Sequence, residues 1–264
     1  MQAECRSGGF RARTIVPPTV VPDKGAGRFC ILVLLGGLAS PATVRGQAPD
    51  TLPPVPAVIT LGDVLATTAA GTLFAAPILF DVGPDTPDCA PCDRRDLPGF
   101  DRWALARERS GWEAASTLAL VGLAVGVELD LVFGERGEGG PHAVALVESA
   151  AWALGLTEVL KAAVGRGRPV LYDPAITPDD VEPDDLRSMP SAHTSAAFAL
   201  ATSWWLSRRA LDAEPRRVPA WLGFVVAAGV GVMRVSAGRH FPSDVVTGAA
   251  LGVASAVVVH AVKF

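Results

Sequence analysis

Apolar residues in this chain gather in blocks that are about as long as a lipid bilayer is thick. A helix needs about 20 predominantly apolar residues to cross the hydrocarbon core of a membrane. Five such blocks, each rich in Ala, Gly, Val and Leu, cover residues 111–133, 143–164, 190–207, 218–236 and 241–263. Small residues let membrane helices approach one another closely, and the alternation typical of strands is absent. The sequence therefore predicts an all-α membrane helical bundle of about five spans.

The arginines of one short loop predict which way the bundle faces. Residues 207–219 contain Arg208, Arg209, Arg216 and Arg217. Basic loops stay in the cytoplasm, so this loop is expected there. Counting spans from it places loops 165–189, 234–241 and 81–109 on the opposite, periplasmic side of a bacterial-type inner membrane. Five arginines in loop 81–109 argue against that placement.

A sixth apolar block, residues 57–80, is diluted by Asp63, by several threonines and by Pro77. If a leader is cleaved before it, the block begins and ends on the periplasmic side. We therefore expect a non-spanning helix that packs on the bundle or lies at the interface. The alternative is that residues 57–80 do cross the membrane and that another block does not.

The first residues have the layout of a secretory signal peptide. Lys24 and Arg28 precede a short apolar run, and small residues follow it, so cleavage after Gly46 or Ala48 fits the pattern. The domain organisation expected from this reading has three parts. They are a signal peptide and leader (1–48), a linker with the non-spanning helix and a periplasmic loop (49–109), and a catalytic domain (110–264).

Two cysteines, Cys89 and Cys92, lie in a loop rich in Asp and Pro. A Cys-x-x-Cys pair in the cytosol is often a redox or metal motif. In an exported loop a small disulfide is the stronger expectation, so we predict that these two residues are oxidised.

Polar residues concentrate where the apolar blocks end. They are Lys161 and Arg168 after the second block, Ser191, Ala192 and His193 at the start of the third, and Arg234, His240 and Asp244 between the last two. Ionisable groups near a bilayer are costly and usually functional. Three cations beside the free N–H groups of a helix start predict an anion site. His240 and Asp244 are four residues apart, so the carboxylate can reach the imidazole.

These motifs resemble those of the type 2 phosphatidic acid phosphatase superfamily, which includes the vanadium haloperoxidases. The family pattern is Lys-x6-Arg-Pro, then Pro-Ser-Gly-His, then Ser-Arg-x5-His-x3-Asp. This chain matches the first motif in full. It has Ala192 where the family usually has Gly, and Met233 where the family usually has Ser. The resemblance covers roughly residues 110–264.

The resemblance implies a role for each of these residues. His240 would be the nucleophile that forms a phosphohistidine, Asp244 would hold its tautomer, and His193 would be the general acid. The phosphate would be held by Lys161, Arg168, Ser191 and Arg234, with the backbone N–H of Ala192. The resemblance implies no cofactor and no metal, because the cations would stabilise the developing charge.

Other polar residues near the motifs have plainer interpretations. Arg166 and Arg239 are expected to contact headgroups or the surface. Glu158 either orients Lys161 or forms a simple ion pair within the helix. The acidic loop 170–189 is either a solvated loop or a gate that disfavours highly charged soluble phosphates.

The expected function is metal-independent hydrolysis of a phosphomonoester or diphosphate on a membrane lipid. Phosphatidate, phosphatidylglycerophosphate and an isoprenyl diphosphate are the candidate substrates, because a site at headgroup level selects molecules by location. The alternatives are a vanadate-dependent haloperoxidase or a non-catalytic membrane protein with a degenerate site. The formal net charge of -4, without a basic tail, gives no indication of a nucleic-acid partner.

Overall fold

A computed structural model of the chain describes residues 59–106, 111–134, 139–211 and 219–264. All regular elements in these ranges are helices, which confirms the all-α membrane bundle. The long helices are α1 (Leu61–Leu79), α3 (Trp112–Gly134), α4 (Gly140–Val164), α5 (Ala192–Ala210), α6 (Leu222–Ser236) and α7 (Pro242–Lys263). The leader predicted for residues 1–48 lies outside the described residues.

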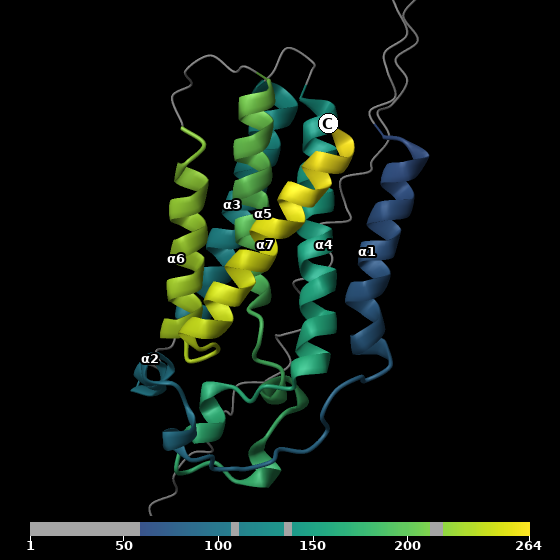
Figure 1. Ribbon diagram of the computed structural model, residues 1–264. Helices are drawn as coiled ribbons and strands as arrows, with labels where there is room; N and C mark the ends of the chain where they lie inside the picture. Colours follow the sequence, from purple (N-terminus) through teal and green to yellow (C-terminus); the bar gives the residue numbers. More distant parts are fainter. Residues whose placement is uncertain (1–58, 107–110, 135–138, 212–218) are drawn as a thin grey trace, which may run out of the picture. The chain divides into compact units, whose positions relative to one another are not determined.

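The long helices run alternately up and down and share two ends (Figure 1). At one end, drawn at the bottom of Figure 1, α1, α4 and α6 finish and α3, α5 and α7 begin. Short helices line this end. They are α2 (Gly99–Arg102) and the 3-10 turns Arg94–Asp96, Trp103–Ala106, Pro169–Tyr172, Pro178–Asp180 and Pro183–Leu186. We call this the site end, because it carries the three polar motifs.

Helix α5 is the centre of the bundle and packs against α3, α4, α6 and α7. Its polar residues Thr194, Ser195, Thr202, Ser203 and Ser207 are buried among these neighbours. The helix predicted as a span at 190–207 is therefore enclosed by protein. The Ser195 hydroxyl donates to the Ala153 carbonyl at 3.4 Å, and the Ser203 hydroxyl lies 2.9 Å from Nε2 of His260. The buried hydroxyls of Thr202 and Ser207 have no hydrogen-bond partner among the described residues.

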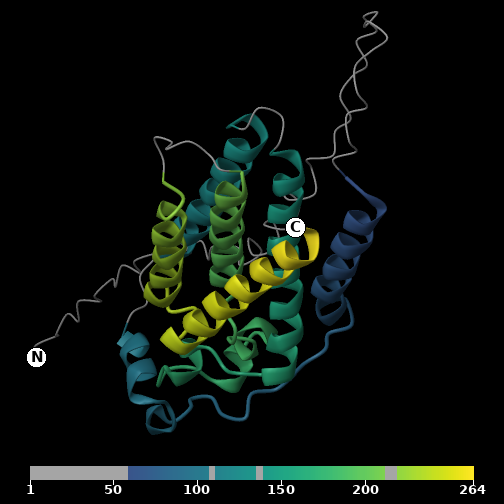
Figure 2. The ribbon, with the colours of Figure 1, turned by 45° about the horizontal axis from the view of Figure 1, so that its top comes forward.

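Helix α7 runs obliquely across α5 and α4 (Figure 2). Two glycines make the close crossing with α5 possible. A Cβ on Gly248 would lie 2.6 Å from the Ser191 carbonyl oxygen, and one on Gly252 would lie 2.1 Å from that of Ser195. The same crossing lets the backbone N–H of Ser191 donate to the Asp244 carbonyl at 3.0 Å. Two of the polar motifs are thereby fixed to one another through the main chain.

Four helical segments of the described part are long and apolar enough to cross a membrane: Leu61–Leu79, Trp112–Phe133, Gly140–Tyr172 and Pro242–Lys263. Helix α6, with 15 residues, is shorter than the span expected at 218–236. The first of the four, α1, was expected not to span. It lies beside α4 and runs in the same direction from the far end to the site end (Figure 1).

The charge that diluted the hydrophobicity of α1 is neutralised in the fold. Asp63, in the first turn of α1, forms an ion pair with Lys263 in the last turn of α7. Lys263 also lies 3.2 Å from the Glu148 carboxylate of α4. A paired charge costs far less in an apolar environment than an isolated one. The length and hydropathy of α1 and the pairing of its charge therefore favour the alternative in which residues 57–80 cross the membrane and another block does not.

Candidate active site

His240 lies in the short connection between α6 and α7 and is only 2% exposed. Its Nδ1 is 2.8 Å from the carbonyl oxygen of Ser188. A carbonyl can only accept a hydrogen bond, so Nδ1 carries the proton and donates it. The other ring nitrogen, Nε2, is then left with a free lone pair. This is the tautomer that a nucleophilic imidazole requires.

Burial lowers the pKa of His240 to about 3. The carboxylate of Asp244 opposes this shift, while the positive charges of Arg168 and Arg234 add to it. The ring is therefore neutral at neutral pH, and its lone pair does not have to be freed by deprotonation.

Asp244 lies beside His240 but does not hold its tautomer directly, which corrects the expected arrangement. Its Oδ2 is 3.7 Å from Nδ1 of His240, beyond hydrogen-bond distance. The same oxygen accepts the Ser188 hydroxyl at 2.6 Å and the Phe241 backbone N–H at 2.8 Å. The Nδ1 proton points to one acceptor, and the Ser188 carbonyl takes that place. Asp244 therefore fixes Ser188 and the start of α7, and Ser188 fixes the ring.

Three buried cations converge on the same end of the bundle. Lys161, Arg168 and Arg234 are 8%, 5% and 4% exposed. Lys161 donates to Glu158 at 2.8 Å, within α4. Arg234 lies 3.5 Å from the Ser116 hydroxyl and 3.9 Å from the Glu113 carboxylate. Among the described residues, the buried Nε atoms of Arg168 and Arg234 have no hydrogen-bond partner.

Arg168 makes its ion pair with Asp184, at 2.8 Å, in the acidic loop. Burial alone would raise the pKa of Asp184, but Arg168 and Lys161 lower it below its ordinary value, with smaller contributions from His240 and Arg239. The carboxylate of Asp184 therefore faces the cations that are expected to bind phosphate. A contact between this carboxylate and Arg168 is expected if the acidic loop is a gate over the site, and it is less expected if the loop is only solvated.

The start of α5 brings the second motif to the site. Ser191 is the N-cap residue, and its side chain does not cap the helix. Its hydroxyl instead accepts from the Thr194 hydroxyl at 3.0 Å. Ala192 and His193 open the helix, so their backbone N–H groups belong to the first turn, where a helix favours anions. The Nε2 of His193 lies 3.1 Å from the Thr117 hydroxyl of α3.

The fold thus brings every predicted site residue of the three motifs to the site end, and it adds residues that the sequence did not indicate. Arg166 was expected at the surface, but it pairs with the buried carboxylates of Asp101 and Asp244, each at 2.7 Å. Arg239 pairs with Glu113 at 2.9 Å in an exposed position, as expected of a surface residue. The side chains that were missed are Asp101, Glu113, Ser116, Thr117, Ser188 and Ser243.

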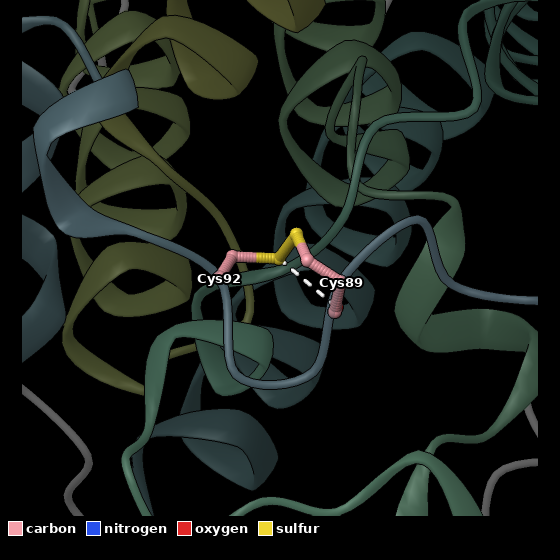
Figure 3. Close-up of a disulfide and its surroundings, with 2 residues drawn as sticks. All are labelled: Cys89 and Cys92. Atoms are coloured by element: carbon pink, nitrogen blue, oxygen red, sulfur yellow. Dashed lines mark hydrogen bonds between the residues drawn. A yellow bond between two sulfur atoms is a disulfide. The ribbon is translucent and has the colours of Figure 1, made fainter.

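The cysteine loop is fastened to the site end. Cys89 and Cys92 form a disulfide (Figure 3). The backbone N–H of Cys92 donates to the Leu171 carbonyl at 2.7 Å, next to the Arg168–Pro169 motif. The disulfide closes a small turn, and this turn anchors the segment that leads to Asp101.

Comparisons with known proteins give a family match over the part of the chain that carries the three motifs. Residues 142–264 match the family model described as the PAP2 superfamily. One similar solved structure is LpxE from Aquifex aeolicus, with 22% identity, a TM-score of 0.46, and coverage of 63% of this chain and 97% of that one. Another is the first transmembrane PAP2 type phosphatidylglycerolphosphate phosphatase from Bacillus subtilis. It has 18% identity, a TM-score of 0.44, and coverage of 77% and 96%. Among curated proteins, none matches the chain.

Proposed function

We propose, on the premise that residues 142–264 belong to the PAP2 superfamily, that this chain is a membrane phosphatase that hydrolyses a lipid phosphate. The observation that carries the proposal is the state of His240. The imidazole is neutral, a carbonyl holds its Nδ1 proton, and Nε2 keeps a free lone pair at the end of the bundle that also carries three buried cations. Such a site favours a phosphoryl group over a neutral substrate.

The reaction proceeds in two displacements. Nε2 of His240 attacks phosphorus, the bond from phosphorus to the leaving oxygen breaks, and His193, protonated when the anionic substrate is bound, gives that oxygen a proton and becomes neutral. A water molecule then attacks the phosphohistidine and transfers a proton to His193. Inorganic phosphate leaves and His240 returns to its neutral form. Both catalytic histidines therefore end the cycle as they began.

The remaining residues stabilise charge that develops on the phosphoryl oxygens. Lys161, Arg168 and Arg234 supply positive charge, and the hydroxyl of Ser191 and the N–H groups at the start of α5 supply donors. These groups are preorganised by the helix ends, so little reorganisation accompanies the reaction. Phosphoryl transfer depends mainly on such positioning and electrostatic stabilisation.

The substrate class follows from where the site lies. All site residues sit at one end of a bundle whose long helices are mostly apolar on the outside. A phosphate bound there lies at headgroup level, while an attached hydrocarbon chain remains in the membrane. We propose phosphatidate, phosphatidylglycerophosphate or an isoprenyl diphosphate as the substrate, with the site on the periplasmic face of a bacterial inner membrane.

The test is phosphate release by the purified full-length protein across a panel of these lipids in mixed micelles. We expect turnover in EDTA, inhibition by vanadate, and loss of turnover in His240→Ala. Activity that disappears in EDTA and returns with Mg²⁺ would contradict the mechanism. Halide oxidation after vanadate loading, without phosphate release, would identify a haloperoxidase instead. A protein inactive in both assays would be the non-catalytic alternative.

A further inference from the structure

Arg166 is the centre of a polar cluster that the catalytic mechanism does not use. Its guanidinium group binds two carboxylates that are both fully buried, Asp101 from α2 and Asp244 from α7. It also donates to the hydroxyl of Ser243 and lies over the ring of Phe241, 4.4 Å from the ring centroid. Arg166 therefore contacts three of the four residues that follow His240.

Asp101 completes this cluster from a different part of the chain. One of its oxygens accepts the backbone N–H of Ser243 at 3.0 Å, and the other accepts the Ser243 hydroxyl at 2.7 Å. Ser243 is in the first turn of α7, where N–H groups lack partners inside the helix. Asp101 thus caps α7 at the point where the chain leaves His240. It lies outside the segment 142–264 that matches the family model.

The cluster is connected to the reactive ring by a short series of contacts. Arg166 holds one oxygen of Asp244, and the other oxygen of Asp244 accepts the Ser188 hydroxyl at 2.6 Å. The carbonyl of the same Ser188 accepts the Nδ1 proton of His240 at 2.8 Å. A displacement of Asp244 would therefore move the group that fixes the tautomer of the nucleophile.

We propose that Arg166 and Asp101 are positioning residues that hold Asp244, and through Ser188 the His240 ring, in the reactive tautomer and orientation. The arrangement suits an arginine, because the planar guanidinium presents its N–H groups in a fixed geometry to both carboxylates and to the Ser243 hydroxyl. Without Arg166, two buried carboxylates would face each other at the start of α7 without a counter-charge, and one of them would have to move or take up a proton.

The proposal rests on the proposed function only for its kinetic test. Arg166→Gln and Asp101→Asn should each lower kcat by roughly 10- to 100-fold, because small displacements of a reacting group cost about that much. KM should change little, since the phosphate contacts remain. Arg166→Lys keeps the positive charge but lacks the paired N–H groups of a guanidinium. Its kcat should therefore lie between that of Arg166→Gln and that of the wild type, closer to Arg166→Gln. The double variant Arg166→Gln with Asp101→Asn should be no slower than Arg166→Gln alone, because Asp101 acts through the same group.

A matched control removes a similar ion pair elsewhere in the bundle. Arg208 of α5 pairs with Asp130 of α3 at 2.9 Å, and its side chain is 9% exposed. Arg208→Gln loses a buried arginine at the end remote from the site. It should lower the melting temperature without lowering kcat, which separates loss of positioning from general loss of stability.

A second readout does not require turnover. The chain has four histidines, so the ¹⁵N signals of His240 can be assigned by substitution. In the wild-type protein Nδ1 should give a protonated signal and Nε2 an unprotonated one at pH 7. In Asp101→Asn and Arg166→Gln the two signals should move toward an average of both tautomers. If the wild-type protein hydrolyses no phosphate ester, the function is wrong but this spectrum still tests the positioning.

Two results would overturn the proposal. One is full kcat and an unchanged His240 spectrum in Arg166→Lys and Asp101→Asn. The other is a double variant whose loss is the product of the two single losses, which would mean that Asp101 and Arg166 act separately.

Discussion

Asp184 forms an ion pair with Arg168, one of the cations proposed to bind the phosphate of the substrate, so removing its charge should improve substrate binding. The carboxylate lies 2.8 Å from Arg168, and its side chain is 64% exposed while that of Arg168 is 6% exposed. A phosphate that binds Arg168 has to displace this contact. Asp184→Asn removes the negative charge and keeps the size of the side chain.

The size of the effect follows from the exposure of the pair. An ion pair with a solvent-exposed partner is worth roughly 0.2–1 kcal/mol. Because RT is about 0.6 kcal/mol, relief of that competition corresponds to a change of about 1.4- to 5-fold in binding. We expect KM for a soluble phosphate monoester and the inhibition constant for vanadate to fall by that factor. The value of kcat should stay within about twofold, since Asp184 is not assigned a role in either displacement.

The assay is steady-state hydrolysis of p-nitrophenyl phosphate with vanadate as a competitor, at low and high salt. Exposed charges are screened over a Debye length of about 8 Å at physiological ionic strength, so the difference between variant and wild type should shrink in high salt. Asp179→Asn is the control, because Asp179 is an exposed acid of the same loop and the change in charge is identical. An unchanged or higher KM in Asp184→Asn, or an equal fall in Asp179→Asn, would refute the reasoning.

Three further predictions follow from the site. His193→Ala should lower kcat/KM on a lipid phosphate by roughly 10²- to 10⁴-fold and far less on p-nitrophenyl phosphate, whose leaving group needs no acid. His240→Ala should abolish activity on both substrates. The reverse pattern would mean that the two histidines have exchanged roles. The folded protein holds the pKa of His240 at about 3, below the ordinary value for histidine of about 6.5. As the pH falls from about 6.5 toward about 3, the unfolded chain therefore binds a proton at His240 that the folded protein does not, and the free energy of unfolding should decrease. Urea titrations at several pH values should show a smaller decrease for His240→Gln than for the wild type. Cys89 and Cys92 should react with an impermeant thiol reagent in intact spheroplasts only after reduction, and labelling seen only after lysis would place their loop in the cytoplasm.

The sequence indicated that the three motifs would come together, because each motif adjoins an apolar block. Antiparallel helices return their ends to the same side, so the order of the blocks alone indicates that Lys161, His193 and His240 meet at one end of the bundle. The family resemblance added the roles but not the contacts. The resemblance implied that Asp244 holds the tautomer of His240. In the structure Nδ1 of His240 donates to the backbone carbonyl of Ser188 instead, and a pattern of side chains cannot indicate a contact with the backbone.

What could not be predicted depends on contacts between distant segments. Asp101 and Arg166 are 65 residues apart, and the loop that contains Asp101 has no periodicity that fixes where its side chains point. The same holds for α1, where the pairing of Asp63 with Lys263 spans 200 residues. Hydropathy treats each segment alone, so it counts a buried carboxylate as a cost even when another helix supplies its partner.

The alternation of the helices has a consequence for the order in which activity can arise during synthesis. At the site end the chain makes three connections between helices of opposite direction, from α1 to α3, from α4 to α5 and from α6 to α7. Asp101 comes from the first connection, Arg168 and Ser188 from the second, and His240 from the third. Chains are made from the N-terminus and generally fold in that order, so His240, the proposed nucleophile, is the last of these residues to arrive. A ribosome-bound chain that lacks α6 and α7 already has Lys161, Arg168 and His193 but not His240. Under the proposed mechanism such a chain has no attacking group, so activity should arise only after the last two helices are inserted.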